Sequence, residues 1–191
     1  GFAGIKLNTV VVRGFNDDEL VDLARFATRT GLEPRYIEYM DVGGATDWDS
    51  TQVVPREEIL ARLAEAFGAV TAEPRHGDPR APAERYRFAD GTVVGVISST
   101  TAPFCRDCDR ARLTADGTLY RCLYAPSGID LRTALRDGSD DVAIRDILRA
   151  AWASRRDRGA EERTAVQERG ILVPLEGLRA DPRKEMHVRG G

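Results

Sequence analysis

Residues 1–71 alternate between segments typical of strands and segments typical of helices, which limits the folds open to the chain. Residues 5–14 (IKLNTVVVRG) are rich in β-branched residues, and residues 34–43 (PRYIEYMDVG) are expected to form the next strand. A strand, helix, strand, helix order at this spacing predicts an α/β fold with two parallel neighbouring strands. Two such strands leave sheet edges open, which indicates the back half of a larger α/β domain.

Two amphipathic helices are expected beside these strands. Asn16, with Glu19 three residues later, is the expected N-cap of the first helix, and Gly31 is expected to end it. Pro55 is expected to open the second helix. The apolar stripes consist of Leu20, Val21, Ala24 and Ala27 in the first helix and Ile59, Leu60, Leu63 and Phe67 in the second.

A proline-rich stretch at residues 72–84 predicts a boundary between a first domain, 1–71, and a second, 72–155. Beyond it, Asp-Gly pairs at 90–91 and 116–117 each lie between strand-like runs and predict two hairpins. Short amphipathic helices are expected at 130–135 and 144–152. Residues 156–191 are charged and irregular and end in Gly-Gly, so we expect much of this tail to be mobile.

Composition excludes several classes of protein. Apolar residues make up 42% and charged residues 31%, the balance of a globular protein. The net charge is -3, whereas nucleic-acid-binding proteins usually carry a basic excess, so no nucleic-acid partner is expected. No apolar run approaches the roughly 20 residues that span a bilayer, and no leader pattern opens the sequence, so we expect no membrane partner and a cytoplasmic location.

All three cysteines of the chain, Cys105, Cys108 and Cys122, fall within eighteen residues. An odd number at this density is a poor disulfide framework and indicates metal or redox chemistry. A two-residue loop at Asp116 and Gly117 would place Cys122 opposite Ala111, on the strand that follows the C-x-x-C turn. The spacing therefore predicts a shared three-thiolate site.

The spacing does not choose the metal. A structural zinc ion normally takes four protein ligands, and the fourth would have to be Asp107, Asp109 or the distant His76. An iron–sulfur cluster on three cysteines would leave one iron open, although four cysteines are common. A thiol pair with a bystander cysteine is the third alternative.

Two arginines follow the C-x-x-C turn. Arg110 and Arg112 are two residues apart, so on a strand they would project on one face. Paired guanidiniums on a strand suit a polyphosphate, which they can bind bidentately. A solvated strand face is the alternative. Lys6 and Lys184 are the only lysines of the chain, which makes each mildly informative.

Four motifs together resemble one family. The strings IKLNTVVVRGFNDDEL, RYIEYMDVG and FCRDCDRARLTADGTLYRCL, followed by a terminal double glycine, closely resemble the molybdenum cofactor biosynthesis protein A family, the radical-SAM GTP 3',8-cyclases. The resemblance runs from about Ile5 to Gly191, with the motifs in the family's order. It implies the C-terminal part of an incomplete (β/α)6 radical-SAM barrel, followed by a hairpin-rich α+β subdomain that binds a cluster.

The resemblance also implies a metal and a substrate. Cys105, Cys108 and Cys122 would hold a [4Fe-4S] cluster whose open iron takes the guanine base of GTP. Arg110, Ala111 and Arg112 would bind the GTP phosphates. No residue of the chain receives a catalytic role.

Further positions match family residues that contact ligands. Lys6 matches a GTP-contacting lysine, with Asn8 on the same strand face as a weaker companion. Met40 matches a position that contacts S-adenosylmethionine, although without the resemblance it would be an ordinary core methionine. Gly190 and Gly191 match a terminal double glycine that reaches into the active site of the family, where the lack of a Cβ permits close approach.

The family's N-terminal C-x-x-x-C-x-x-C run is missing from this chain. The second [4Fe-4S] cluster, which cleaves S-adenosylmethionine, would therefore belong to an N-terminal half that is truncated or separately encoded. Expected partners are GTP, S-adenosylmethionine and that missing half. A homodimer is also expected, and the product would pass to a cyclic pyranopterin monophosphate synthase. The rival interpretations are a zinc-ribbon binding module and another radical-SAM enzyme with an auxiliary cluster.

Overall fold

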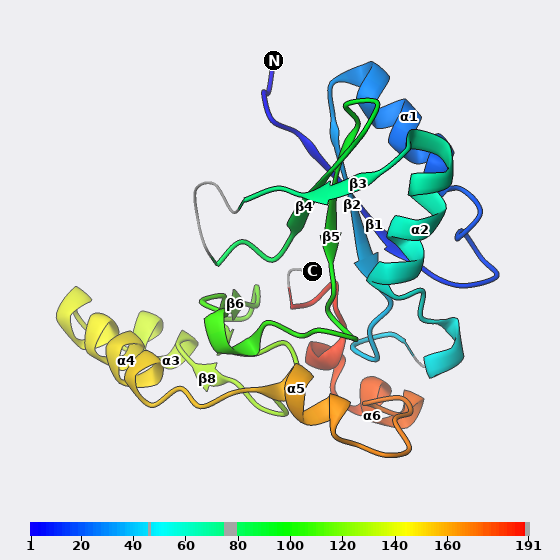
Figure 1. Cartoon of the computed structure of the whole chain (residues 1–191). Coiled ribbons are helices and arrows are strands. Elements are labelled where there is room, and N and C mark those ends of the chain that lie inside the picture. Colours follow the sequence, from blue (N-terminus) through cyan, green and yellow to red (C-terminus); the bar gives the residue numbers. More distant parts are fainter. Residues whose placement is uncertain (46, 75–79, 190–191) are drawn as a thin grey trace. The chain divides into compact units, whose positions relative to one another are not determined.

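The computed structural model describes residues 1–45, 47–74 and 80–189. These residues belong to two compact units (Figure 1). The first contains Gly1–Met40 and Asp49–Phe104, and the second contains Asp41–Trp48 and Cys105–Gly191. Within the described ranges, no helix combines the length and the apolar character that crossing a membrane requires.

A mixed five-stranded sheet forms the first unit, in the order β1-β2-β5-β4-β3. Strand β1 (Lys6–Val11) runs parallel to β2 (Glu33–Glu38), which confirms the predicted parallel pair. Strand β5 (Val93–Ile97) continues the parallel half beside β2. Strands β4 (Glu84–Phe88) and β3 (Val70–Ala72) extend the sheet in antiparallel fashion.

Helices α1 (Leu20–Thr30) and α2 (Arg56–Phe67) carry the predicted apolar stripes. Figure 1 shows the two helices side by side next to the sheet. Gly31 ends α1 in the left-handed conformation at φ 71°, and Pro55 is the N-cap of α2, as predicted. The core between helices and sheet consists of Val11, Leu20, Ala24, Tyr36, Val54, Ile59, Leu63, Phe67, Tyr86, Phe88, Val94 and Val96.

The predicted N-cap at Asn16 is wrong. Helix α1 begins at Leu20 with Glu19 as its N-cap. The Asn16 side chain instead accepts a hydrogen bond from the Val12 amide (2.8 Å) and donates one to the Val10 carbonyl (2.9 Å). Asparagine side chains often bond to nearby backbone in this way, and here the bonds close the turn that follows β1.

The hairpin predicted at Asp90 and Gly91 is present, and it forms part of the first sheet. Its strands are β4 and β5, and β5 pairs with β2 on its other side. The apolar strand β5 is thereby buried between two neighbours. The two units divide after Phe104, whereas the sequence favoured a division at residue 72, because β4 pairs with β3 in the same sheet.

The second unit contains a small antiparallel sheet in the order β6-β7-β8 and several short helices. The strands are β6 (Arg112–Leu113), β7 (Thr118–Tyr120) and β8 (Ile129–Asp130), and the helices are α3 (Arg132–Arg136), α4 (Asp141–Ala153), α5 (Gly159–Thr164) and α6 (Leu175–Ala180). Single 3-10 turns occur at η1 (Ser50–Gln52, first unit), η2 (Cys105–Asp107) and η3 (Pro182–Lys184).

The C-terminal segment, expected to be irregular, contains regular structure. It holds α5, α6 and η3, and both Leu178 and Arg189 are buried. The Arg189 guanidinium donates to the carbonyls of Leu123 (2.7 Å) and Arg183 (2.7 Å) and lies over the Tyr120 ring. These contacts explain how a charged segment can pack, while its mobility stays a prediction.

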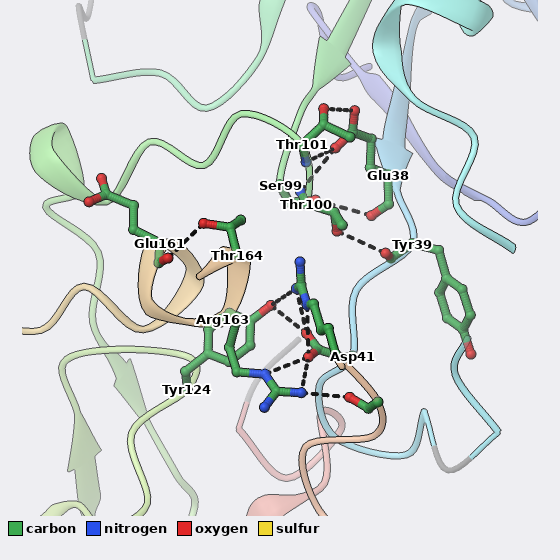
Figure 2. Close-up of polar contacts among 12 residues, drawn as sticks. Glu38, Tyr39, Asp41, Ser99, Thr100, Thr101, Tyr124, Glu161, Arg163 and Thr164 are labelled. Carbon is green, nitrogen blue, oxygen red and sulfur yellow. Dashed lines mark hydrogen bonds and ion pairs between the residues drawn. The ribbon is translucent and has the colours of Figure 1, made fainter. Parts of the chain in front are cut away.

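A buried carboxylate lies where β2 ends. Glu38 is fully buried, and its two oxygens accept four hydrogen bonds. Figure 2 shows the bonds from Thr100 and Thr101. The donors are the amides of Arg56 (2.9 Å), Thr100 (2.9 Å) and Thr101 (2.7 Å) and the Thr101 hydroxyl (2.6 Å). Glu38 thus joins the end of β2 to the first turn of α2 and to the segment after β5, within the first unit.

We expect Glu38→Gln to lower the free energy of unfolding by at least about 2 kcal/mol, because the amide NH₂ would face donors and leave them unsatisfied. Urea denaturation measures this change. Glu57→Gln is the matched control, because the Glu57 side chain is 67% exposed and pairs with Arg56 at the surface. Equal stabilities of the two variants would contradict the structural role of Glu38.

Candidate metal centre

The three cysteines lie in the second unit, and each is a partly buried free thiol. Cys105 begins the η2 turn, and residues 98–104 separate this turn from the end of β5. The Cys108 amide donates to the Cys105 carbonyl (3.3 Å), so the C-x-x-C forms a closed turn, as its spacing predicted. A turn of this kind brings two thiols to one side of the backbone.

The hairpin that leads to Cys122 differs from the prediction by one residue. Arg112 pairs with Tyr120 and Leu113 with Leu119, so the loop contains three residues, 115–117, in place of two. Gly117 has a φ of 87°, and its amide donates to the Thr114 carbonyl (2.9 Å), the usual arrangement of a three-residue hairpin loop. The predicted pairing of Cys122 with Ala111 is therefore wrong, and β7 ends at Tyr120 before it reaches Cys122.

The first turn of α5 lies against Cys105 and Cys122. The amides of Glu161 and Ala160 act to lower the pKa of the Cys105 thiol, whereas the nearby Glu161 and Cys122 side chains act to raise it. Burial is nevertheless the largest influence, and it raises the pKa of Cys105. At Gly159 an added Cβ would lie 2.4 Å from the Tyr124 Cβ and 3.1 Å from the Cys122 sulfur, so only glycine fits there.

Cys108 lies among positive charges. Its sulfur accepts from the guanidiniums of Arg110 (3.4 Å) and Arg155 (3.5 Å). Burial by itself would raise the pKa of Cys108, but the Arg110 amide and the two guanidiniums outweigh it, and the pKa is lowered. Cys108 therefore becomes a thiolate more readily than Cys105.

Arg112 is half-buried at the start of β6, while Arg110 is exposed and precedes that strand. Burial, followed by the charge of Arg110, lowers the pKa of Arg112. The Nε of Arg112 is buried and has no hydrogen-bond partner within the described part of the chain. A buried guanidinium with an unused donor is suited to an anionic ligand.

The other predicted ligand-contacting residues with described positions lie in the first unit. Lys6 and Asn8 are exposed on alternate positions of β1, so they share a strand face, as expected. Met40 is partly buried and follows the end of β2. Gly190, Gly191 and the alternative ligand His76 lie outside the described residues. The ligand contacts proposed for all of these residues stay predictions.

A buried ion-pair network, which no sequence pattern predicted, surrounds Asp41 in the second unit (Figure 2). The fully buried Asp41 carboxylate accepts from Arg163 (2.7 Å), Arg169 (2.7 Å) and the Tyr124 hydroxyl (3.0 Å). Burial would raise the pKa of Asp41, but the hydrogen bonds from Arg169 and Arg163 lower it. The arginines are 128 and 122 residues away in sequence, so local spacing carries no signal of this network.

Gly43 and Trp48, which follow Asp41 in sequence, lie close to residues of the C-terminal segment. At Gly43, whose φ is 57°, an added Cβ would lie 2.5 Å from the Met186 Cγ and 2.8 Å from the Met186 amide nitrogen. Trp48, which ends the loop, is buried, and the Arg169 guanidinium lies over its ring at 5.1 Å. Asp41, Gly43 and Trp48 therefore pack against distant parts of their own unit.

Among residues 1–45, 47–74 and 80–189, no group of three or more His, Cys, Asp or Glu side chains is arranged as a site for a metal ion. The described features of the centre are three partly buried thiols, amide and guanidinium donors around them, and one unpartnered arginine nitrogen. These features define an α/β protein with a cysteine-rich, positively charged candidate site.

Comparison with known proteins identifies the family. The model of the family described as Molybdenum Cofactor Synthesis C matches residues 32–161. Among curated relatives, a "GTP 3',8-cyclase 3" from Mycobacterium bovis is 50% identical over the whole chain, and the chain covers 50% of that relative. A "GTP 3',8-cyclase" from Aquifex aeolicus is 43% identical over 83% of the chain, which corresponds to 47% of that relative.

The chain belongs to the Molybdenum Cofactor Synthesis C family, which confirms the resemblance inferred from its motifs. It spans about half the length of the curated relatives that it matches. The matched range includes all three cysteines and both arginines that follow the C-x-x-C turn.

We expect Gly159→Ala to displace the start of α5 and to speed the reaction of the reduced thiols with Ellman's reagent severalfold. The new methyl group cannot be accommodated beside the Tyr124 Cβ, and such overpacking costs about 1–3 kcal/mol. Gly170→Ala is the matched control, since nothing lies within 4 Å of its added Cβ. Thiol reaction rates equal to those of the control would show that Gly159 does not close the site.

Proposed function

We propose that the chain is the GTP-binding half of a GTP 3',8-cyclase and that Cys105, Cys108 and Cys122 hold a [4Fe-4S] cluster. The observation that supports this proposal is that three partly buried thiols lie in one unit, with Arg110 bonded to the Cys108 sulfur and an unpartnered Arg112 Nε, in a chain 50% identical to proteins with that name. The names of the relatives indicate the reaction, and the residues of this chain indicate where the cluster and the nucleotide would bind.

The chemistry of the donor set fits an iron–sulfur cluster. Such clusters are bound by cysteine thiolates, and N–H groups that bond to the sulfurs adjust their reduction potential. Donors of this kind face Cys105 from α5 and Cys108 from two guanidiniums. When bound, a cluster on three cysteines would supply an iron with a free position for an atom of the guanine base.

The arginines suit the triphosphate of GTP. Arg112 has an unused buried donor, the Nε atom. The exposed Arg110 precedes it by two residues in sequence, with Ala111 between them. Two guanidiniums and the intervening backbone can bind several phosphate oxygens at once, with charge-assisted hydrogen bonds. Phosphate binding by Arg110, Ala111 and Arg112 would fix the nucleotide at its charged end.

The first unit would belong to a radical-SAM barrel. Ligands of open α/β sheets bind beyond the carboxyl ends of the parallel strands, and Met40 follows that end of β2. Lys6 and Asn8 would contact GTP from β1. Strand β1 is an edge of the sheet, and its open side could pair with strands from the part of the relatives that this chain does not span.

The contribution of this chain to catalysis would be positioning. The radical that starts the reaction must meet one ribose hydrogen among several, so the base and the phosphates must be held still. The cysteines that cleave S-adenosylmethionine would lie in the other half, because this chain contains only the three already assigned. The product, 3',8-cyclo-7,8-dihydro-GTP, would pass to a cyclic pyranopterin monophosphate synthase.

We expect the chain, reconstituted anaerobically with iron and sulfide, to bind GTP but not to convert it. GTP should perturb the EPR spectrum of the reduced cluster, because the base would approach an iron of the cluster. Stoichiometric zinc without iron, after expression with both metals present, would instead favour a zinc module. Cyclisation by the chain alone, with S-adenosylmethionine and reductant, would refute the division of labour.

Replacement of both Arg110 and Arg112 with alanine should weaken GTP binding by at least about tenfold and guanosine binding far less. Each charge-assisted hydrogen bond is worth about 1.5–3 kcal/mol, and guanosine has no phosphate to lose. Isothermal titration of both ligands measures the difference. The exposed Arg106, between the first two cysteines, provides an Arg→Ala control that should leave both affinities unchanged. Equal losses for GTP and guanosine would exclude the phosphate role.

A further inference from the structure

Arg155 contacts Cys108 in two places. Its Nη1 donates to the Cys108 carbonyl at 2.7 Å, and its Nη2 lies 3.5 Å from the Cys108 sulfur. One rigid guanidinium therefore bonds to both the backbone and the thiol of the same residue. The Arg155 side chain is only 12% exposed, so these bonds lie in a largely water-excluded environment.

The orientation of Arg155 is itself determined by its neighbours. Arg155 follows the C-terminus of α4, and its guanidinium lies over the Trp152 ring at 4.8 Å. Its amide donates to the Trp152 carbonyl at 3.1 Å. The Asp157 carboxylate lies 3.8 Å from the Arg155 Nε, the nitrogen that takes no part in the two contacts with Cys108.

Asp157 also connects this arginine to the segment that carries Cys122. The Asp157 oxygen near Arg155 lies 3.5 Å from the Nε of Arg121, the residue before Cys122. Arg121 in turn donates to the Ala151 carbonyl (2.5 Å) and the Ser154 hydroxyl (3.1 Å) at the end of α4. The end of α4 is thus bonded to both cysteine-bearing segments of the hairpin region.

We propose that Arg155 is a positioning residue of the metal centre, which holds the C-x-x-C turn and raises the reduction potential of the cluster bound there. This inference rests on the proposed function, since it requires a cluster on the three cysteines. It assigns a role to a residue outside the segment 105–122 and outside the phosphate-binding pair.

The physical reason is the charge that reduction adds. A cluster gains one negative charge on reduction, and a guanidinium beside a ligand sulfur stabilises that state more than the oxidised state. The effect is larger where water is excluded, because the dielectric screening is weaker. Arg110 also contacts the Cys108 sulfur, but it is exposed, so Arg155 should dominate the effect.

The test compares Arg155→Ala, Arg155→Lys and the control Arg156→Ala in the full chain, reconstituted with iron and sulfide. Arg156 is exposed and donates to the carbonyls of Ala153 and Arg155, so it tests loss of a neighbouring charge without loss of contact with Cys108. The midpoint potential is measured by EPR-monitored titration. The chain has three cysteines in all, so a single cluster signal is expected.

We expect Arg155→Ala to lower the reduction equilibrium constant about tenfold, a shift of 59 mV to more negative potential. Arg155→Lys should shift the midpoint potential less, because an ammonium keeps the charge but cannot bond to the Cys108 carbonyl and sulfur at once. Arg156→Ala should leave the midpoint potential unchanged.

An Arg155→Ala potential equal to that of the wild type, at equal iron content, would overturn the inference and leave the proposed function intact. A wild-type chain that binds no cluster would overturn both. If Arg155→Ala does not fold, the potential of Arg155→Lys decides, and a value equal to that of the wild type rejects the role.

Discussion

Buried charge that is fully hydrogen-bonded is the constraint on which both units depend. A carboxylate removed from water is costly unless donors replace its hydration, and the four residues 38–41 include two such carboxylates, Glu38 and Asp41. Glu38 is satisfied by backbone amides and a hydroxyl within the first unit. Asp41 is satisfied by two arginines and a tyrosine within the second. Both networks require distant segments to be in place together.

Arginine is the common element of the second unit. Arg163 and Arg169 neutralise Asp41, Arg189 bonds to two carbonyls, and Arg155 and Arg110 contact the Cys108 sulfur. A guanidinium suits these tasks because it carries several donors in one rigid plane and keeps its charge when buried. The positive field that results favours thiolate over thiol at Cys108 and favours an anionic ligand beside Arg112. Metal binding and phosphate binding would therefore draw on the same set of residues.

Most local structure was predictable from the sequence, and the errors were local competitions between hydrogen bonds. The apolar stripes of α1 and α2, the stop at Gly31 and both Asp-Gly hairpins are confirmed. Asn16 does not cap α1 because the turn after β1 uses its side chain. The second hairpin loop has three residues because Asp116 does not take the positive φ that a two-residue type I′ loop requires at both of its positions, and only Gly117 is left-handed. The family followed from motifs alone and is confirmed by comparison.

The sequence by itself determined the helices, the parallel strand pair and the family, because each depends on residues that are close together or on a recognisable motif. The shared site of the three cysteines stays a prediction from their spacing. Only the tertiary structure decided that β4 and β5 join the first sheet and that Asp41 pairs with Arg163 and Arg169. It alone placed Arg155 on Cys108, a contact across 47 residues. Such contacts arise when charges are buried together, and the partner of a buried charge is chosen by the packing of whole elements, which leaves no trace in local spacing.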